Sequence, residues 1–160
     1  MNNIEKYFAG EKLQCTIGII LSFISIALSV YFLALHKPLL RGISFVFIPL
    51  SVLLLIICIG VVTRTPKDIE RITGFYKTEP QKIQTDELPR MEKVMKNFTL
   101  IKRIELCFFT AGLLLTIFFG KNDLIKGIAI GLMIQGAILY LFDYSAEVRG
   151  KVYFEFLKSL

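Results

Sequence analysis

Four long apolar runs constrain this chain more than any other feature of its sequence. They cover residues 13–35, 42–63, 104–120 and 124–142. Each is long enough, or nearly so, to cross a hydrocarbon core about 30 Å thick at a helical rise of about 1.5 Å per residue. Hydrophobic residues make up 54% of the chain and the mean hydropathy is +0.63, which is too apolar for an ordinary soluble domain. The sequence therefore predicts a single four-span membrane domain over residues 1–160.

The first two runs also exclude a soluble helical bundle. Residues 17–35 and 42–62 carry no charge on any face, whereas a helix on the surface of a soluble protein needs a polar face. The first run is longer than the apolar core of a signal peptide and is followed by no small-residue cleavage site. We therefore expect it to remain in the protein as a transmembrane helix.

Basic residues are shared unequally among the gaps between the runs. Of 19 Lys and Arg residues, 10 lie in the central bridge, residues 64–103. With four spans, one side of the membrane carries 15 of them and the other side carries 4. The positive-inside rule then places both termini and the bridge in the cytoplasm, at the inner membrane if the source is bacterial. The bilayer is thus the first expected partner, with anionic lipids of the cytoplasmic leaflet. Acidic residues interleave with the basic ones, so nucleic acid is not expected.

The gaps predict how the helices connect. The short gaps 36–41 and 121–123 force two antiparallel transmembrane hairpins, which we expect to form an all-α four-helix bundle. In the bridge, Thr65 followed by Pro66 is typical of a helix cap and first turn, so a new helix is predicted there. Residues 77–86 are expected to be irregular. A second helix is predicted from Pro89, with Asp86 or Thr85 as its cap.

Two cytoplasmic segments have the apolar stripe of an amphipathic helix. The first precedes the third span, and the second is the C-terminal helix, residues 146–160. We expect both helices to lie at the headgroup level of the membrane, although docking on a partner protein is an alternative. The stripes consist of Met91, Val94, Met95, Phe98 and Ile101 in the first segment, and Tyr153, Phe156, Leu157 and Leu160 in the second.

Each span carries one stripe of small or polar residues. Helices in lipid associate through residues that permit close approach and through interhelical hydrogen bonds, so these stripes predict packing inside the bundle. A polar pathway is the alternative, but no ionisable group lies near the predicted midplane. The stripes are Gly18, Ser22, Ser25 and Ser29; Ser44, Ser51 and Cys58; Glu105, Gly112 and Thr116; and Gly136, Tyr140, Asp143 and Glu147.

A second face of the fourth span contains a GxxxG pair. Gly127 and Gly131 are followed four residues later by Gln135, on a face rotated away from the stripe of Tyr140. Such a face permits helix packing or contact between copies of the chain. We expect it to point outward and to support a homo-oligomer, with Gln135 bonded to its symmetry mate or to Ser22.

One polar cluster is expected at the cytoplasmic mouth of the bundle. Its carboxylates could bind a divalent metal through oxygen, and its cations could bind a lipid headgroup. Pairing among themselves at the water interface is the simpler interpretation, and we predict no metal and no cofactor. The cluster consists of Lys102, Arg103, Glu105, Tyr140, Asp143, Glu147 and Arg149.

Three cysteines lie in the cytoplasmic halves of their helices. Cys15, Cys58 and Cys107 match no metal-binding spacing, and small apolar packing is their commoner role. Because that side of the membrane is reducing, we expect free thiols rather than disulfides.

The sequence favours function classes only weakly. The single histidine, His36, has no catalytic partner nearby, and no phosphate loop or hydrolase motif is present. The leading hypothesis is a non-enzymatic accessory protein that oligomerises or binds a membrane partner. The alternatives are a membrane enzyme or lipid-headgroup-binding protein with a site at the cytoplasmic mouth, and a small transporter or channel.

Overall fold

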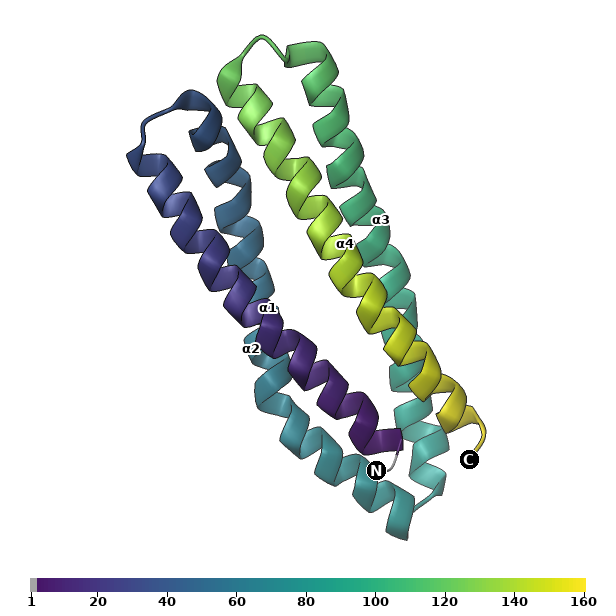
Figure 1. The fold of residues 1–160 in the computed structure, drawn as a ribbon. Helices are drawn as coiled ribbons and strands as arrows, with labels where there is room; N and C mark the ends of the chain where they lie inside the picture. Colours follow the sequence, from purple (N-terminus) through teal and green to yellow (C-terminus); the bar gives the residue numbers. More distant parts are fainter. Residues whose placement is uncertain (1–2) are drawn as a thin grey trace.

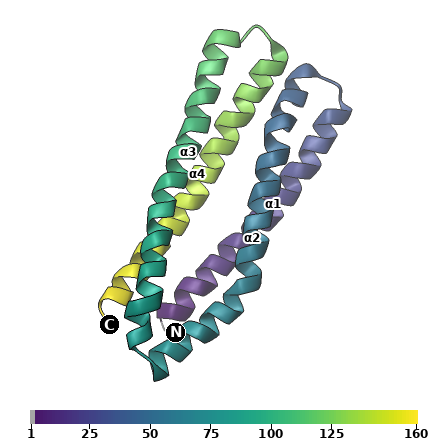
Figure 2. The ribbon, with the colours of Figure 1, turned by 180° about the vertical axis from the view of Figure 1, so that it is seen from behind.

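The chain folds into four long helices arranged as two antiparallel hairpins (Figure 1). The computed structural model describes residues 3–160 and contains only helices and turns over that range. The loops of both hairpins lie at one end of the molecule, here called the loop end, and both termini lie at the other, the terminal end (Figure 2). The helices are α1 (Asn3–Ala34), α2 (Pro38–Thr78), a π-helical turn η1 (Ile83–Glu87), α3 (Leu88–Phe119) and α4 (Asp123–Lys158).

Local chemistry sets the two hairpin turns. His36 adopts a positive φ of 53°, and Pro38 begins α2 with the backbone angle that a first helical turn requires. At the second turn, the side chain of Asn122 accepts hydrogen bonds from the amides of Leu124 and Ile125 at 3.0 and 3.2 Å, which caps α4. The predicted antiparallel hairpins are therefore present.

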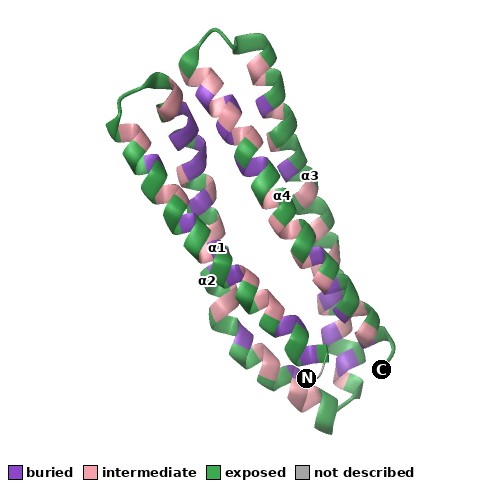
Figure 3. Ribbon diagram, in the orientation of Figure 1, coloured by how far each residue is buried: buried purple, intermediate pink, exposed green. Residues whose placement is uncertain are grey.

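Three of the helices, α1, α2 and α4, are long and apolar enough to cross a membrane. Helix α3 is not among them, because its apolar run begins only at Ile104, directly after Lys102 and Arg103, and includes Glu105. Large apolar side chains nevertheless cover its outer half, where Ile117 and Phe118 are 66% and 72% exposed. Figure 3 shows exposed residues along the outward faces of both hairpins.

Small residues join α1 to α2, as their spacing predicts. The hydroxyl of Ser44 donates to the carbonyl oxygen of Ser29 at 2.9 Å, and Ser51 donates to the hydroxyl of Ser25 at 2.7 Å. Nearer the terminal end, Gly18 lies against the thiol of Cys58, where an added Cβ would be 2.7 Å from the sulfur. Hydrogen bonds and close approach of small residues thus help to hold this hairpin together.

Helix α2 continues through the position where a new helix was expected. Thr65 does not cap; its hydroxyl donates to the carbonyl oxygen of Val61 at 2.7 Å, within the same helix. Pro66 lies inside α2. Because Pro66 has no N–H, the carbonyl of Val62 loses its usual helical partner, and α2 changes direction in this region (Figure 1). The prediction of a helix start at Thr65 was wrong.

The irregular stretch is also shorter than expected. After α2 ends at Thr78, the chain turns within a few residues and enters η1, which leads directly into α3. The residue before α3 is Glu87, in a helical conformation and without a side-chain cap. Neither Asp86 nor Thr85 therefore caps this helix, which corrects the predicted cap. A widened helical turn replaces most of the expected loop.

Helix α4 packs against α3 along its length, and also against α2 and α1. The face of Gly127 and Gly131 is buried within the chain itself. A Cβ added at Gly127 would lie 3.0 Å from the Cα of Gly42 on α2, and Gly131 lies beside Val46. Gln135 is buried as well. The expectation that this face points outward is thus wrong, and these residues act in helix packing. Ser22 has no hydrogen-bond partner, so the anticipated bond to Gln135 is not formed.

The largest apolar cluster lies at the terminal end, where extensions of all four helices meet. Tyr7 of α1 stacks on Tyr153 of α4, with ring centroids 4.3 Å apart. The stripes expected to rest on the membrane surface contribute to this cluster through Met91 and Leu157. The surface-helix prediction was wrong because these helices bury their apolar faces against one another. The buried members are Ile4, Tyr7, Phe8, Ile72, Ile83, Met91, Tyr153 and Leu157.

Candidate functional site: a groove between the two hairpins

A groove with a volume of about 720 Å³ lies between the hairpins. Helices α2 and α3 form its two sides, and residues of α1 and α4 complete it. Within residues 3–160, α2 and α3 make no direct helix-to-helix contact, so the groove is not closed along that side. Its lining is apolar over most of the length and polar toward the terminal end. The polar and cysteine residues of the lining are Glu11, Gln14, Cys15, Cys58, Arg64, Asn97, Glu105, Asp143 and Arg149.

Two carboxyl groups meet on the wall of the groove. Glu105 of α3 is only 4% exposed, and its carboxyl lies close enough to that of Asp143 on α4 to interact with it. The close packing of α3 on α4 explains the pairing, because an added Cβ at Gly136 would lie 3.0 Å from the carbonyl oxygen of Glu105. The Oε2 atom of Glu105 is buried, and the polar group beside this carboxyl is the carboxyl of Asp143. Each carboxyl is therefore the nearest polar partner of the other in the apolar wall.

A glutamine on α1 holds the arginine at the polar end of the groove. The Nε2 of Gln14 donates to the carbonyl oxygen of Phe142 at 2.5 Å, and its Oε1 accepts a hydrogen bond from Arg149. The stem of Arg149 crosses Gly10, where an added Cβ would lie 2.7 Å from its Cδ. The Nε–H of Arg149 is buried and has no partner. Arg149 thus lies at the polar end of the groove with its guanidinium held by Gln14.

The rest of the predicted mouth cluster divides into separate parts. Glu147 pairs with Lys102 of α3 and with Lys151 one turn along α4, the latter at 3.2 Å. The hydrogen bond from Lys102 is the main reason that the pKa of Glu147 lies below its usual value. Arg103 is exposed and forms no ion pair within the described chain. Tyr140 is 37% exposed and lies outside the groove lining.

The cluster thus supplies two carboxyls, not three, to one place. Glu147 is occupied by lysines, and no group of three metal-ligating side chains converges among residues 3–160. The oxygen-ligand metal site considered from the sequence has no geometric support. Glu105, Asp143 and Arg149 are the predicted residues that share the groove.

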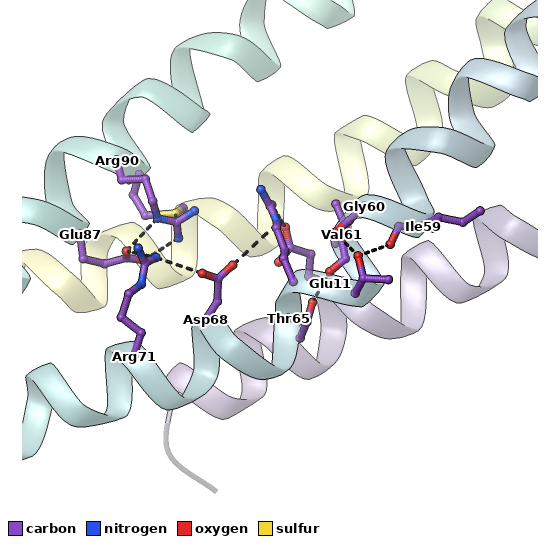
Figure 4. A network of polar contacts seen from close by, with 12 residues as sticks. Glu11, Ile59, Gly60, Val61, Thr65, Asp68, Arg71, Glu87 and Arg90 are labelled. Atoms are coloured by element: carbon purple, nitrogen blue, oxygen red, sulfur yellow. Dashed lines mark hydrogen bonds and ion pairs between the residues drawn. The ribbon is translucent and has the colours of Figure 1, made fainter.

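Below the groove, a buried carboxylate joins three helical segments. Glu87 is 1% exposed and accepts two hydrogen bonds from Arg90, at 2.7 and 2.6 Å. It also accepts one from the hydroxyl of Tyr153 on α4 at 3.2 Å, and Arg71 of α2 lies 3.8 Å away (Figure 4). Burial raises the pKa of Tyr153, and the Glu87 carboxylate raises it further. This arrangement fixes the ends of α2, α3 and α4 relative to one another.

The same network continues to α1. Arg71 also pairs with Asp68 at 3.1 Å, Asp68 pairs with Arg64, and Arg64 reaches Glu11 of α1 at 3.3 Å (Figure 4). Burial raises the pKa of Glu11, and the Arg64 charge partly offsets that shift. Ion pairs thus run from the rim of the groove into the apolar cluster at the terminal end.

Sequence reasoning missed several groove residues. Glu11 precedes the first apolar run and Gln14 is its second residue, and nothing in their spacing indicates contact with α4 or α2. The spacing of Cys15 and Cys58 matches no metal site, and their pairing depends on the register of the α1–α2 hairpin. The serine pairs Ser29–Ser44 and Ser25–Ser51 define that register, and extending it toward the termini would have placed Cys15 near Cys58.

Comparisons with known protein families, with curated proteins and with solved structures find no match to this chain. The assignment of a function therefore depends on the geometry of the groove and on the chemistry of the groups that line it.

Proposed function

We propose that this chain is a four-span membrane protein with cytoplasmic termini whose groove binds a single amphiphilic small molecule drawn from the bilayer. Its polar head would lie at Glu105, Asp143 and Arg149, and its apolar part would extend along α2. One observation carries the proposal: an apolar groove of about 720 Å³ holds on its wall a pair of interacting carboxyl groups, the buried Glu105 and the half-buried Asp143, with Arg149 in the same lining.

The membrane part of the proposal is supported by composition and exposure. Helices α1, α2 and α4 are apolar enough to span a bilayer, and α3 lies antiparallel to α4 with large apolar side chains exposed on its outer half. A soluble protein rarely exposes so much contiguous apolar surface. The excess of Lys and Arg at the terminal end favours a cytoplasmic position for that end.

The size and lining of the groove support a small occupant. Pockets for drug-sized molecules hold about 300–1,000 Å³ and combine apolar walls with a few placed polar groups. Here Leu54 and Ile57 of α2 face Ile104 and Phe108 of α3 across the groove. Glu105 is the second residue of the third apolar run, so its carboxyl lies at the expected cytoplasmic end of that run and borders the apolar lining of the groove.

The hypothesis of an accessory protein that oligomerises or binds a membrane partner stays a prediction. One surface that copies could have used, the face of Gly127, is covered by α2. The lipid-headgroup alternative gains support because a pocket now exists where the sequence placed only charges.

The test is photo-crosslinking in lipid nanodiscs with a single-chain alcohol that carries a diazirine. Adducts are expected on the groove-facing residues of α2 and α3, as mapped by peptide mass spectrometry. Gly60 lines the groove, and a Cβ added there meets no atom within 4 Å, so Gly60→Phe fills the groove without disturbing packing. We expect this variant to form at least 5-fold fewer groove adducts, which corresponds to about 1 kcal/mol in the free energy of binding.

Gly74→Phe is the matched control. Gly74 lies on the same helix, an added Cβ there also meets nothing within 4 Å, and it is absent from the groove lining. It should label like the unchanged protein. Equal labelling of all lipid-facing residues, with no effect of Gly60→Phe, would overturn the proposal.

A further inference from the structure

Two cysteines from different helices meet on the wall of the groove. Cys15 of α1 and Cys58 of α2 both line it, and their thiols are near enough to interact with each other. The sulfur of Cys58 points toward α1, because a Cβ at Gly18, one turn from Cys15, would lie 2.7 Å from it. Both thiols are free in this structure, and Cys107 on α3 is separate from the pair and exposed.

The two thiols lie beside charged side chains and beside the open side of the groove. Arg149 and Glu11 are charged neighbours of Cys15, and Asp143 is a charged neighbour of Cys58. The pair is buried from water, with Cys58 0% and Cys15 7% exposed, but it borders a groove that is open between α2 and α3. An oxidant would thus reach it from the bilayer.

We propose that Cys15 and Cys58 form a redox-active dithiol, and that the molecule which occupies the groove is a lipid-soluble acceptor of the quinone class. This inference rests on the proposed function and names the class of molecule bound. Two S–H bonds break and one S–S bond forms between Cys15 and Cys58. The electron pair passes to the quinone ring, and the two protons end on its two oxygens, which gives the hydroquinone and one intrachain disulfide.

The polar groups of the groove match that acceptor. A quinone presents carbonyl oxygens, which accept hydrogen bonds, and the guanidinium of Arg149 belongs to a residue that lines the same groove. Reduction of the quinone consumes two protons, and the carboxyl groups of Glu105 and Asp143 line the same groove as the thiols. Electron donors, a hydrogen-bond donor and proton-carrying groups therefore lie around one space.

The test uses the full chain in nanodiscs, reduced and then exposed without oxygen to a short-tail benzoquinone. The background variant is Cys107→Ser, which removes the exposed thiol and leaves only the pair. We expect one hydroquinone formed per chain, a mass lower by two hydrogen atoms, and a peptide that links Cys15 to Cys58. Cys15→Ser and Cys58→Ser should each abolish all three signals. Gly60→Phe should slow the reaction at least 5-fold, whereas Gly74→Phe should leave its rate unchanged.

Retention of both thiols after quinone treatment, measured by alkylation of the unfolded chain, would overturn the inference. So would oxidation by the water-soluble oxidant diamide without any oxidation by the quinone. Either result alongside specific diazirine adducts in the groove would leave amphiphile binding intact, so failure of the redox inference is distinguishable from failure of the proposed function. Loss of the diazirine adducts as well would overturn both the redox inference and the proposed function.

Discussion

Gln14 and Arg149 tie the first helix of the chain to the last. The amide of Gln14 accepts from the guanidinium of Arg149 and donates to the carbonyl oxygen of Phe142, so one side chain bridges α1 to α4 at two points. The contact joins residues 135 positions apart in sequence and fixes the polar rim of the groove.

Replacing Gln14 should therefore destabilise the fold. Gln14→Leu leaves the carbonyl of Phe142 without its donor and the Arg149 guanidinium without its acceptor, at a cost of about 1–3 kcal/mol. The expected result is a lower thermal unfolding temperature in detergent. Gln81→Leu is the control, because Gln81 is exposed at the terminal end and should change stability little. Equal stability of the two variants would show that the bridge contributes nothing.

The contact between α2 and α4 should depend on the absence of a side chain at Gly127. A Cβ there would collide with the carbonyl oxygen of Leu39, so Gly127→Ala must push the two backbones apart. We expect a loss of about 1–3 kcal/mol or more, seen as a lower unfolding temperature. Gly74→Ala, in open space on α2, should instead gain up to about 1 kcal/mol from helix propensity. A stable Gly127→Ala variant with altered mass in solution would favour an oligomer contact instead.

The carboxylate of Glu87 should be among the most sensitive positions at the terminal end. Glu87→Ala leaves Arg90 partly buried with no counter-ion and removes the acceptor of the Tyr153 hydroxyl, which we expect to cost about 3–5 kcal/mol. Tyr153→Phe removes only the hydrogen bond and should cost about 1 kcal/mol. Glu92→Ala, which breaks the exposed pair with Lys96, should change the stability least of the three. Urea or thermal unfolding of the three variants gives the order.

The pH dependence of stability should include a contribution from Glu147. Its pKa is lowered in the folded state, chiefly by the hydrogen bond from Lys102. The lysine pairs therefore stabilise the fold fully above the unfolded-state pKa of about 4.3, and that stability is lost as the pH falls through the folded pKa. Glu147→Gln should flatten this acid-side loss in thermal unfolding between pH 3 and pH 6, a window of roughly the unfolded pKa ± 1.5. A parallel loss in both proteins would contradict the assignment.

The two hairpins and the α1–α2 interface could be predicted from the sequence because they follow from short-range patterns. The short gaps around His36 and Asn122 indicated hairpins, and the serine spacing indicated the α1–α2 interface, whose hydrogen bonds the structure contains. These inferences succeeded because they depend on short-range spacing and on the need to satisfy polar groups inside an apolar helix pair.

The errors arose where tertiary contacts override local signals. Thr65 and Pro66 have the pattern of a helix start, yet packing of the continuous α2 against α1 and η1 keeps the helix going. The stripes of Met91 and Leu157 fit a membrane surface as well as a partner within the chain, and periodicity cannot separate the two. Glu105 and Asp143 were singled out, but the groove that they share follows from the spacing between hairpins, which no local pattern encodes.

The two hairpins are held together at both ends of the molecule. Gly42 contacts Gly127 at the loop end, and the apolar cluster joins the helices at the terminal end. The groove lies between these two contacts and is open at its side rather than at one end. For the proposed amphiphile, the side between α2 and α3, which make no direct contact within residues 3–160, is the open way in. If the helices span a bilayer as proposed, this side faces lipid, and partitioning into the bilayer would decide which molecules reach the groove.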